Sequence, residues 1–337
     1  MRGGLGHVNI SASIMFAGMS GAAVADAGGL GAIEVKAMRN KGYDLGFSVG
    51  ITAASSTIGP IIPPSLPMII YGVMASASIG QLFAAGFIPG LLMAISLMIM
   101  VAYYAKKRNY PKDAGFSMPR VATTFKSAFL SLMTPIIIGG ILFGIFTATE
   151  AAIAATVYAL ILGSVIYRTL TIRKLIKVSM ETIETTSIIL LIIAGAAIFS
   201  WVLTSQHVTE DFTRWMLTIT DNKTLILLMI TFILFAVGCF METIAAITIL
   251  TPVLLPIAVS LGIDPVHFGV VMILNLMIGL LTPPVGMVLY VLSRVTKVPF
   301  EECAKATFPF VIPLVIVLLL VTFIPELSMW LPTLLYR

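Results

Sequence analysis

The chain has 337 residues, of which 59% are hydrophobic and only 10% are charged, and its mean hydropathy is +1.07. Soluble globular proteins contain roughly 45–50% apolar and about 25% charged residues, so this composition excludes a soluble domain and indicates a polytopic membrane protein. The net charge of +5 comes largely from two basic loops between apolar stretches, so it does not require a nucleic-acid partner.

The long apolar stretches are predicted to be helices. A spanning helix needs roughly 18 or more mainly apolar residues, and the sequence does not show the alternating ten-residue pattern of a membrane barrel. The fold class predicted is therefore an all-α polytopic membrane protein. The clearest apolar stretches, each with apolar flanks, are 91–104, 135–146, 151–166, 225–240 and 309–323.

The first predicted region, 1–105, begins with apolar residues 8–25, which are rich in small side chains. This composition is typical of closely packed membrane helices. Asp26 follows as a candidate intramembrane acid, which is a functional hypothesis by default. Gly42 and Asp44 then mark the end of one helix and the start of the next, with Asp44 as the N-cap.

Residues 55–65 read Ser-Ser-Thr-Ile-Gly-Pro-Ile-Ile-Pro-Pro-Ser and interrupt an otherwise apolar helix. Each proline removes an amide donor and clashes with the preceding turn, so this segment is predicted to be unwound rather than kinked. An unpaired carbonyl in lipid costs several kcal/mol unless protein, water or an ion covers it. The break is therefore expected to line a cavity.

Two basic loops set the predicted orientation. Two apolar spans separate these loops, so both lie on one side of the membrane, which the positive-inside rule assigns to the cytoplasm. The region 106–120 is the first loop. The region 121–185 contains the two scaffold spans, joined by a capping box of Thr147 and Glu150, and an amphipathic arm over 172–186. The basic residues are Lys106, Lys107, Arg108, Lys112 and Arg120 in the first loop, and Arg168, Arg173, Lys174 and Lys177 in the second.

The last predicted region is 186–337. Apolar residues 188–203 precede a polar sequence at 204–207, which predicts a re-entrant hairpin over 188–221; an ordinary span with a polar loop is the alternative. Residues 225–261 predict one span and a shorter helix, with Glu242 as a second candidate intramembrane acid. The helix that starts at Asp264 breaks at 280–286, Leu-Leu-Thr-Pro-Pro-Val-Gly.

A constant offset relates the two breaks: 279 − 59 = 220 for the glycine, and 283 − 63 = 220 for the first proline of each pair. Chance is a poor explanation for matching glycines, caps, breaks and prolines together, so the chain is predicted to be a duplicated helical bundle. The sequence leaves open whether the repeats are parallel or inverted. The same offset, without a gap, joins Gly18 to Gly238, Gly42 to Gly262, Asp44 to Asp264, Ile58 to Ile278, Pro64 to Pro284 and Pro89 to Pro309.

Paired broken helices are typical of secondary transporters, which bind substrate and ions at such breaks near the bilayer midplane. Freed carbonyls suit Na⁺, a hard cation that prefers oxygen ligands, and the helix N-termini after each proline pair favour an anionic substrate. Na⁺ is therefore the expected coupling ion. Its predicted ligands are Ser56, Gly59, Gly279, Thr282 and Gly286. The predicted substrate-binding residues are Ser55, Thr57, Pro64, Ser200 and Pro284.

Four motifs resemble the large membrane subunit of tripartite ATP-independent periplasmic (TRAP) transporters, and the resemblance covers nearly the whole chain. They are Gly-Met-Ser-Gly at 18–21 with Asp26, the segment 52–64, Phe-Thr-Ala-Thr-Glu-Ala-Ala at 146–152, and Leu-Thr-Pro-Pro-Val-Gly at 281–286. Ala148 departs from the family, which often has proline at that position.

The resemblance implies an elevator-type carrier of the bacterial inner membrane, embedded in lipid and driven by a Na⁺ gradient. Its substrates would be carboxylates, such as C4-dicarboxylates or sialic acid, delivered by a periplasmic binding protein, and it would work with a small membrane subunit. The family also has two hairpins that face the two broken helices. The second would match 188–221, whereas the first is expected upstream of Met1, which would make the chain N-terminally incomplete.

Two other functions fit parts of the sequence. Residues 18–21 also match the Gly-x-Ser-Gly pattern of rhomboid-type intramembrane proteases, whose serine needs a histidine base within hydrogen-bond reach. The candidate pairs join Ser20 to His7, His207 or His267. Helix packing explains these small residues better, so no enzymatic activity is expected. A channel or scaffold subunit is the other alternative, and saturable Na⁺-dependent uptake would count against it.

Overall fold

The computed structural model describes residues 2–111, 118–141, 144–208 and 222–336, together with residues 211, 214, 218 and 220. The first part of the chain forms α1 (Gly4–Ser20), α2 (Ala23–Gly29), α3 (Gly31–Asn40), α4 (Leu45–Ser56), α5 (Leu66–Ala75) and α6 (Ile79–Lys107). The middle part forms α7 (Met118–Gly139), α8 (Ala148–Ile161), the short π-helix η1 (Leu162–Ile166) and α9 (Ile172–Ser205). The last part forms α11 (Lys223–Phe240), α12 (Thr243–Ser260), α13 (Pro265–Gly279), α14 (Met287–Thr296), α15 (Phe300–Phe323) and α16 (Glu326–Leu335).

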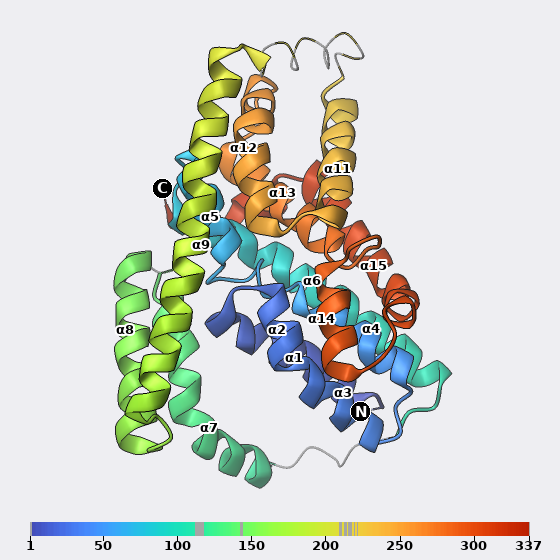
Figure 1. Cartoon of the computed structure of the whole chain (residues 1–337). Coiled ribbons are helices and arrows are strands. Elements are labelled where there is room, and N and C mark those ends of the chain that lie inside the picture. Colours follow the sequence, from blue (N-terminus) through green and yellow to red (C-terminus); the bar gives the residue numbers. More distant parts are fainter. Residues whose placement is uncertain are drawn as a thin grey trace.

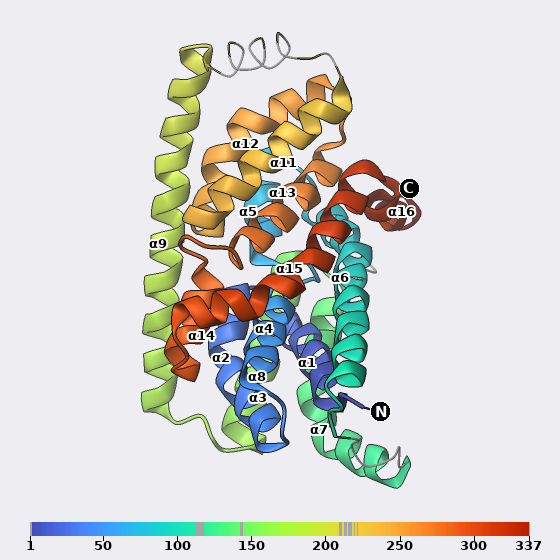
Figure 2. The ribbon, with the colours of Figure 1, turned by 90° about the vertical axis from the view of Figure 1, so that its right-hand side faces the viewer.

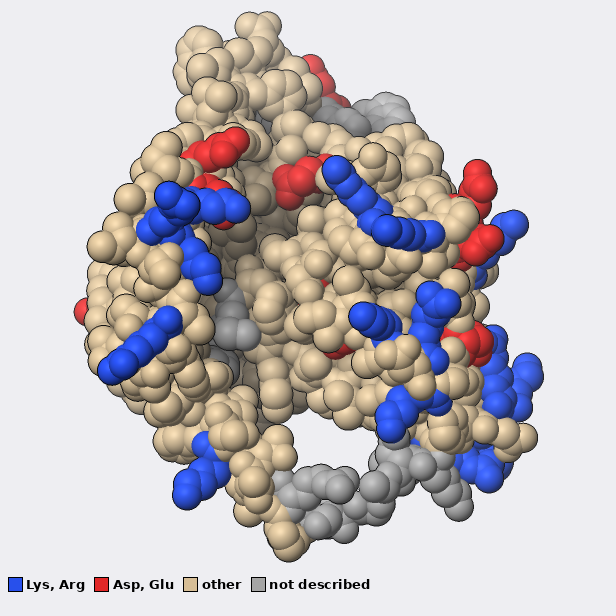
Figure 3. All heavy atoms as spheres, turned by 60° about the horizontal axis from the view of Figure 1, so that its bottom comes forward, with Lys and Arg blue, Asp and Glu red and all other residues tan. Residues whose placement is uncertain are grey.

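Six helices of the described residues are long and apolar enough to cross a membrane: α6, α8 with η1, α9, α11, α12 and α15. The protein is therefore an all-α polytopic membrane protein. The end of α6 and the connection from η1 to α9, which carry the two basic loops, both lie toward the bottom of the molecule in Figure 1. Figure 3 shows this face, where Lys and Arg side chains predominate over Asp and Glu. The described basic residues of the two loops, at 106–108 and 168–177, thus lie on one side, as the sequence predicted.

The helices of the last part follow those of the first part at the predicted spacing. Subtracting 220 from the bounds of α11 to α15 gives 3–20, 23–40, 45–59, 67–76 and 80–103. These ranges match α1, the pair α2 and α3, then α4, α5 and α6. Each half therefore consists of a helical hairpin, a helix broken into two pieces, and a long helix.

The two halves point in opposite directions. In Figures 1 and 2, α1 begins beside the N-terminus in the lower half of the molecule, which also holds α2 to α4, whereas α11 begins at the top of the upper half, which also holds α12 and α13. The second piece of each broken helix crosses over: α5 packs on α12 and α13, and α14 packs on α2, α3 and α4. This interlocked arrangement is that of an inverted repeat, the alternative that the sequence left open.

Matching stop and start signals give both halves the same local structure. Asp44 caps α4 by accepting a hydrogen bond from a backbone N–H at 2.8 Å, and Asp264 caps α13 in the same way at 2.7 Å. Just before these caps, Gly42 and Gly262 have φ angles of +82° and +71°, a region that side chains other than glycine enter only at a cost. Both predicted N-caps are confirmed.

The first pieces of the two broken helices form the centre of the molecule. Every residue from Phe47 to Ser56 in α4 and from Val266 to Gly279 in α13 is buried. A helix that is apolar on all sides must be surrounded by other helices: α4 packs on α15, α1 and α3, and α13 packs on α11 and α12. The breaks at the ends of α4 and α13 consequently begin inside the protein.

The middle helices lie outside this centre. The predicted capping box of Thr147 and Glu150 starts α8, whereas α7 ends at Gly139, before the end of the span expected at 135–146. The predicted amphipathic arm and the first part of the predicted hairpin are one helix, α9, which no proline interrupts. The two predicted regions that meet between 185 and 186 are therefore joined by this continuous helix. Most of the polar return after Ser205 lies outside the described residues.

Candidate substrate and ion site

The first break, residues 57–65, follows from missing amide donors. The three prolines of the break have no N–H, so the carbonyls of Ser56, Gly59 and Pro60, four residues before them, lose their helical donors. The Ser65 hydroxyl replaces one of these donors by bonding the Pro60 carbonyl at 2.5 Å, and it also accepts a hydrogen bond from the first turn of α5 at 3.1 Å. The carbonyls of Ser56 and Gly59 are the acceptors that this break makes available.

The hydroxyl groups of the first break are turned toward its own backbone. Ser56 donates to the Ala53 carbonyl at 2.8 Å, and Thr57 donates to the Ala54 carbonyl at 2.7 Å. Ser55, Ser56 and Thr57 are all buried. Because each hydroxyl donates its only proton in a hydrogen bond, the lone pairs of its oxygen can coordinate a cation.

The second break, residues 280–286, uses the same chemistry with one difference. Its proline pair deprives the carbonyls of Gly279 and Leu280 of helical donors, but these carbonyls accept instead from the N–H groups of Thr282 at 2.9 Å and Val288 at 3.3 Å. The Thr282 hydroxyl donates to a carbonyl one turn earlier at 3.1 Å. Gly286 starts α14 with a φ of +52° and without a side-chain cap.

The two breaks also differ in exposure. Residues 57–62 are buried, whereas Pro283, Pro284 and Val285 are exposed. The first break is consequently an enclosed group of oxygen acceptors. The second break opens to the surface at its proline pair and leads directly to the uncapped N-terminus of α14.

The turn between α1 and α2 lies against the first break. Gly21, with a φ of +58°, accepts a hydrogen bond from the Leu66 N–H at 3.4 Å. A Cβ added to Gly21 would lie 2.7 Å from the Pro64 carbonyl oxygen. The helices α1 and α2 therefore form the hairpin that faces this break, and residues 18–21 lead into its turn. The expectation that this hairpin lies upstream of Met1 is wrong.

The turn between α11 and α12 lies against the second break. The Cys239 carbonyl accepts hydrogen bonds from the N–H groups of Val285 at 3.2 Å and Gly286 at 3.4 Å. A Cβ added to Gly279 would lie 2.5 Å from the Gly238 carbonyl carbon, so the backbones of α11 and α13 are in direct contact. The hairpin that faces the second break is therefore α11 and α12. The described part of the segment predicted for this role, 188–221, lies mainly in α9 on the outside of the molecule (Figures 1 and 2).

The structure brings most of the predicted site residues to the two breaks. Ser200 belongs to neither group, because it lies on α9, which packs on α12. The first group is Ser55, Ser56, Thr57, Gly59 and Pro64. The second group is Gly279, Thr282, Pro284 and Gly286.

A polar network next to the first break was not predicted from the sequence. Asn9 on α1 donates through Nδ2 to Glu34 Oε2 on α3 at 2.6 Å and to Thr52 Oγ1 on α4 at 2.8 Å. Ser55 donates to Asn9 Oδ1 at 2.8 Å, and Ser13 donates to Ser55 Oγ at 3.1 Å. The signal that could have revealed this network is the lone asparagine in an apolar helix, because a buried amide needs hydrogen-bond partners.

The two candidate intramembrane acids have different surroundings. Glu242 caps α12, accepting hydrogen bonds from the N–H groups of Ile244 at 2.8 Å and Ala245 at 3.1 Å, so it has a structural role. Asp26 is 1% exposed, and neither of its carboxylate oxygens accepts a hydrogen bond from the described residues. Burying an unpartnered carboxylate is costly, so Asp26 requires another explanation.

The geometry does not support a serine protease. The Ser20 hydroxyl has no hydrogen-bond partner in the described part of the chain. His7 precedes it by 20 − 7 = 13 residues on the same helix, which places it roughly 20 Å away at 1.5 Å per residue. His267 is bonded through Nδ1 to Ser328 Oγ at 2.7 Å.

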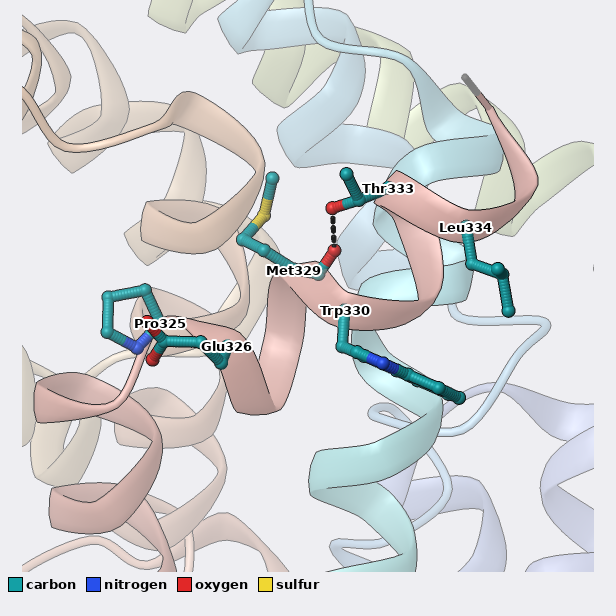
Figure 4. A pocket seen from close by; sticks show the side chains of 6 residues that line it. All are labelled: Pro325, Glu326, Met329, Trp330, Thr333 and Leu334. Atoms are coloured by element: carbon teal, nitrogen blue, oxygen red, sulfur yellow. Dashed lines mark hydrogen bonds between the residues drawn. The ribbon is translucent and has the colours of Figure 1, made fainter.

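A cavity of about 400 Å³ along α16 is not part of this site. Figure 4 shows the six side chains that line it, all from Pro325 to Leu334 and mostly apolar. Trp330 and Leu334 are each 59% exposed, and the hydroxyl of Thr333 bonds the Met329 carbonyl. This surface is suited to contact with lipid tails rather than to binding a polar substrate.

Two inverted halves, each with a broken helix and a hairpin turn held against the break, define a class of protein. They are the architecture of a secondary transporter that binds its ligands at discontinuous helices. The family model that matches the chain is described as the tripartite ATP-independent periplasmic transporter, DctM component, and it covers residues 1–327.

Individual relatives agree with this match. The sialic acid TRAP transporter large permease protein SiaM of Vibrio cholerae is 50% identical over 333 residues, covering 98% of this chain and 78% of the relative. The sialic acid permease SiaT of Haemophilus influenzae is 43% identical, covering 99% of this chain and 54% of the relative. The C4-dicarboxylate large permease DctM of Pseudomonas aeruginosa is 37% identical, covering 98% and 78%.

The chain therefore belongs to the DctM family of TRAP transporter large permeases. Members of this family are multi-pass proteins of the bacterial inner membrane, and they are transport proteins rather than enzymes.

Proposed function

We propose that this chain is the membrane-embedded carrier of a Na⁺-coupled importer of carboxylates, and that sialic acid is the substrate to test first. The relatives at 50% and 43% identity are named for sialic acid, and the relative at 37% identity is named for C4-dicarboxylates. Both substrate classes carry a carboxylate, which is the group that the breaks are suited to bind.

The observation that carries this proposal is the pairing of each break with a hairpin turn. At the second break, α14 begins without a side-chain cap beside the exposed Pro284. The Val288 N–H in this first turn bonds the Leu280 carbonyl, but no side chain caps the turn, and the helix dipole attracts an anion to it. At the first break, Ser65 already caps α5. The substrate carboxylate is therefore assigned to the N-terminus of α14.

The Na⁺ ions are assigned to the oxygen atoms at the two breaks. The buried first break offers the carbonyls of Ser56 and Gly59, which lost their helical donors. The second break offers the carbonyl of Gly279, which carries one hydrogen bond and keeps a second lone pair, together with Thr282 and Gly286. A cation at these positions would hold each hairpin turn against its break, which is how ion binding can favour one conformation of a carrier.

We also propose the two partners that the description of a tripartite periplasmic transporter suggests: a periplasmic substrate-binding protein and a small membrane subunit. α9 is suited to contact a membrane partner or lipid, because it is nearly all exposed and its apolar segment is long.

The proposal is tested in proteoliposomes that contain the permease together with the small subunit and the binding protein encoded by neighbouring genes. Uptake of radiolabelled sialic acid should be saturable, and it should require both the binding protein and an inward Na⁺ gradient. Uptake that is unchanged when K⁺ replaces Na⁺ would refute the coupling. Rapid, unsaturable flux would favour a channel instead.

A further inference from the structure

Asp26 on α2 and Glu34 on α3 have no role in the sites proposed at the breaks. Three of their four carboxylate oxygens are buried and accept no hydrogen bond from the described residues: both oxygens of Asp26, and Oε1 of Glu34. Both acids lie beside α1, where Asn9 bonds Glu34 at 2.6 Å and Ser13, one turn further along the helix, adjoins Asp26. Ionised carboxylates buried without a counter-charge are strongly unfavourable, so each of these groups needs a bound proton or a bound cation to neutralise it.

The hydrogen-bond donors of the neighbouring side chains are engaged elsewhere. The amide of Asn9 donates to Glu34 Oε2 and to Thr52. The Ser13 hydroxyl lies within hydrogen-bonding reach of both Asp26 and Ser55. It has one proton, and because Ser55 donates its own proton to Asn9, the Ser13 proton bonds Ser55 Oγ at 3.1 Å. What remains around Asp26 is a set of oxygen lone pairs, the ligands that a hard cation prefers.

Basic side chains do not fill this role either. Within the described residues the ion pairs are Arg108 with Asp44 and Lys177 with Glu181. The basic residues on α3, Lys36 and Arg39, are exposed, and so is Arg294 on the adjoining α14.

The second half of the molecule shows that the fold does not need this polar network. Adding 220 to positions 9, 13, 26, 34 and 52 gives Met229, Ile233, Ala246, Leu254 and Met272. The same arrangement of hairpin and broken helix is therefore packed there with apolar side chains. A feature that costs stability and that packing does not require is expected at a functional position.

We propose that Asp26, Glu34 and Ser13 form a further cation site, which binds Na⁺ inside the first hairpin and is separate from the two sites at the breaks. The cation neutralises the buried carboxylates and links α1, α2 and α3. Ser13 and Asn9 connect this site to Ser55 at the end of α4, so its occupancy also stabilises the hairpin against the first break. The site does not depend on the proposed substrate, because it is inferred from the unpartnered oxygens.

The test is binding of ²²Na⁺ to the purified permease in lipid nanodiscs, measured to saturation. Asp26→Ala should bind one ion fewer per chain than the wild type, and Glu34→Gln should bind that ion more weakly. The matched control is Glu181→Gln, which changes the charge equally at an exposed residue of α9 and should bind as many ions as the wild type. Excess K⁺ should not displace the ion from the wild type.

A second measurement separates a cation site from a purely structural role. Without Na⁺, Asp26→Ala should unfold at the same temperature as the wild type or higher, because an unpartnered charge has been removed and alanine is the residue at the matching position 246. With Na⁺, the wild type should gain more stability than the variant. A structural role predicts instead that the variant is less stable in both conditions.

The outcomes also distinguish this site from those at the breaks. If the sites at the breaks are wrong, variants without the proline pairs keep all their bound ions, while Asp26→Ala still loses one. The further site is refuted if Asp26→Ala binds as much ²²Na⁺ as the wild type and Glu181→Gln, or if K⁺ displaces the ion equally well.

Discussion

An added methyl group should lower the free energy of unfolding most at the contact between α11 and α13. In Gly279→Ala, the new Cβ would lie 2.5 Å from the carbonyl carbon of Gly238, 2.7 Å from its Cα and 2.9 Å from its oxygen. Non-bonded carbon atoms prefer about 3.5–4.0 Å, so the two helices must separate by about 1 Å. The obstacle is the backbone of a packed helix, which cannot rotate out of the way.

The size of the destabilisation depends on which atom the new Cβ would contact. Overpacking a core typically costs about 1–3 kcal/mol, and a backbone obstacle places Gly279→Ala at the upper end, about 3 kcal/mol. In Gly238→Ala the nearest atom, the Cα of Leu276, is 3.1 Å away, so this variant should cost clearly less. Function should suffer as well, because Cys239, the residue after Gly238, bonds the second break.

The assay is equilibrium unfolding in mixed detergent micelles, with Na⁺-dependent uptake measured on the same variants. The matched control is Gly195→Ala in α9, where an added Cβ meets nothing within 4 Å. This control should be neutral or should stabilise the helix by up to about 1 kcal/mol. An unfolding free energy of Gly279→Ala equal to that of the wild type would refute the close contact between these helices.

Three further predictions concern the breaks, the first hairpin turn and the carboxyl of Asp44. Replacing either proline pair by alanines should restore amide donors to the freed carbonyls and raise the Na⁺ concentration needed for half-maximal uptake, whereas Pro309→Ala inside α15 should not. Gly21→Ala should lower uptake, because its Cβ would lie 2.7 Å from a carbonyl oxygen of the first break and because its φ is +58°. Burial would raise the pKa of the Asp44 carboxyl, but hydrogen bonds from Arg108, Tyr110 and a backbone N–H hold it below its usual value. A carboxyl with a lowered pKa stabilises the folded state at a pH above the unfolded-state pKa, and this contribution is lost as the pH falls through the folded-state pKa. The stability of the wild type should therefore decrease more steeply below about pH 4 than the stability of Asp44→Asn.

Each of these predictions can fail on its own. Unchanged Na⁺ activation in both double-proline variants would remove the ion sites from the breaks. Normal uptake by Gly21→Ala would mean that the first hairpin turn need not lie against the break during transport. Equal acid sensitivity of the wild type and Asp44→Asn, which keeps a residue suited to capping, would show that the charge of Asp44 contributes nothing measurable.

The local features of this protein could be predicted because they depend on the chemistry of neighbouring residues. A proline lacks an N–H wherever it stands, so both helix breaks were predictable, and Asp44 and Asp264 begin helices because their side chains reach the next N–H groups. The offset of 220 is likewise a property of the sequence, and the bounds of the helices in the two halves follow it.

The hairpins could not be predicted in this way. The contact that defines the first hairpin joins Gly21 to Leu66, and the contact that defines the second joins Cys239 to Val285. These pairs are 66 − 21 = 45 and 285 − 239 = 46 residues apart. A hairpin and an ordinary span have the same apolar composition, so no local pattern distinguishes α1 and α2, or α11 and α12, from membrane-spanning helices.

The sequence by itself determined the membrane class, the two broken helices with their caps, and the duplication, because composition, missing amide donors and residue spacing are properties of the chain. Only the tertiary structure decided that the halves are inverted, that the hairpins lie at α1–α2 and α11–α12, and that the buried carboxylate oxygens of Asp26 accept no hydrogen bond from the described part of the chain. The physical reason is that burial and long-range contact depend on which helices pack together, and apolar helices of similar composition can pack in many ways.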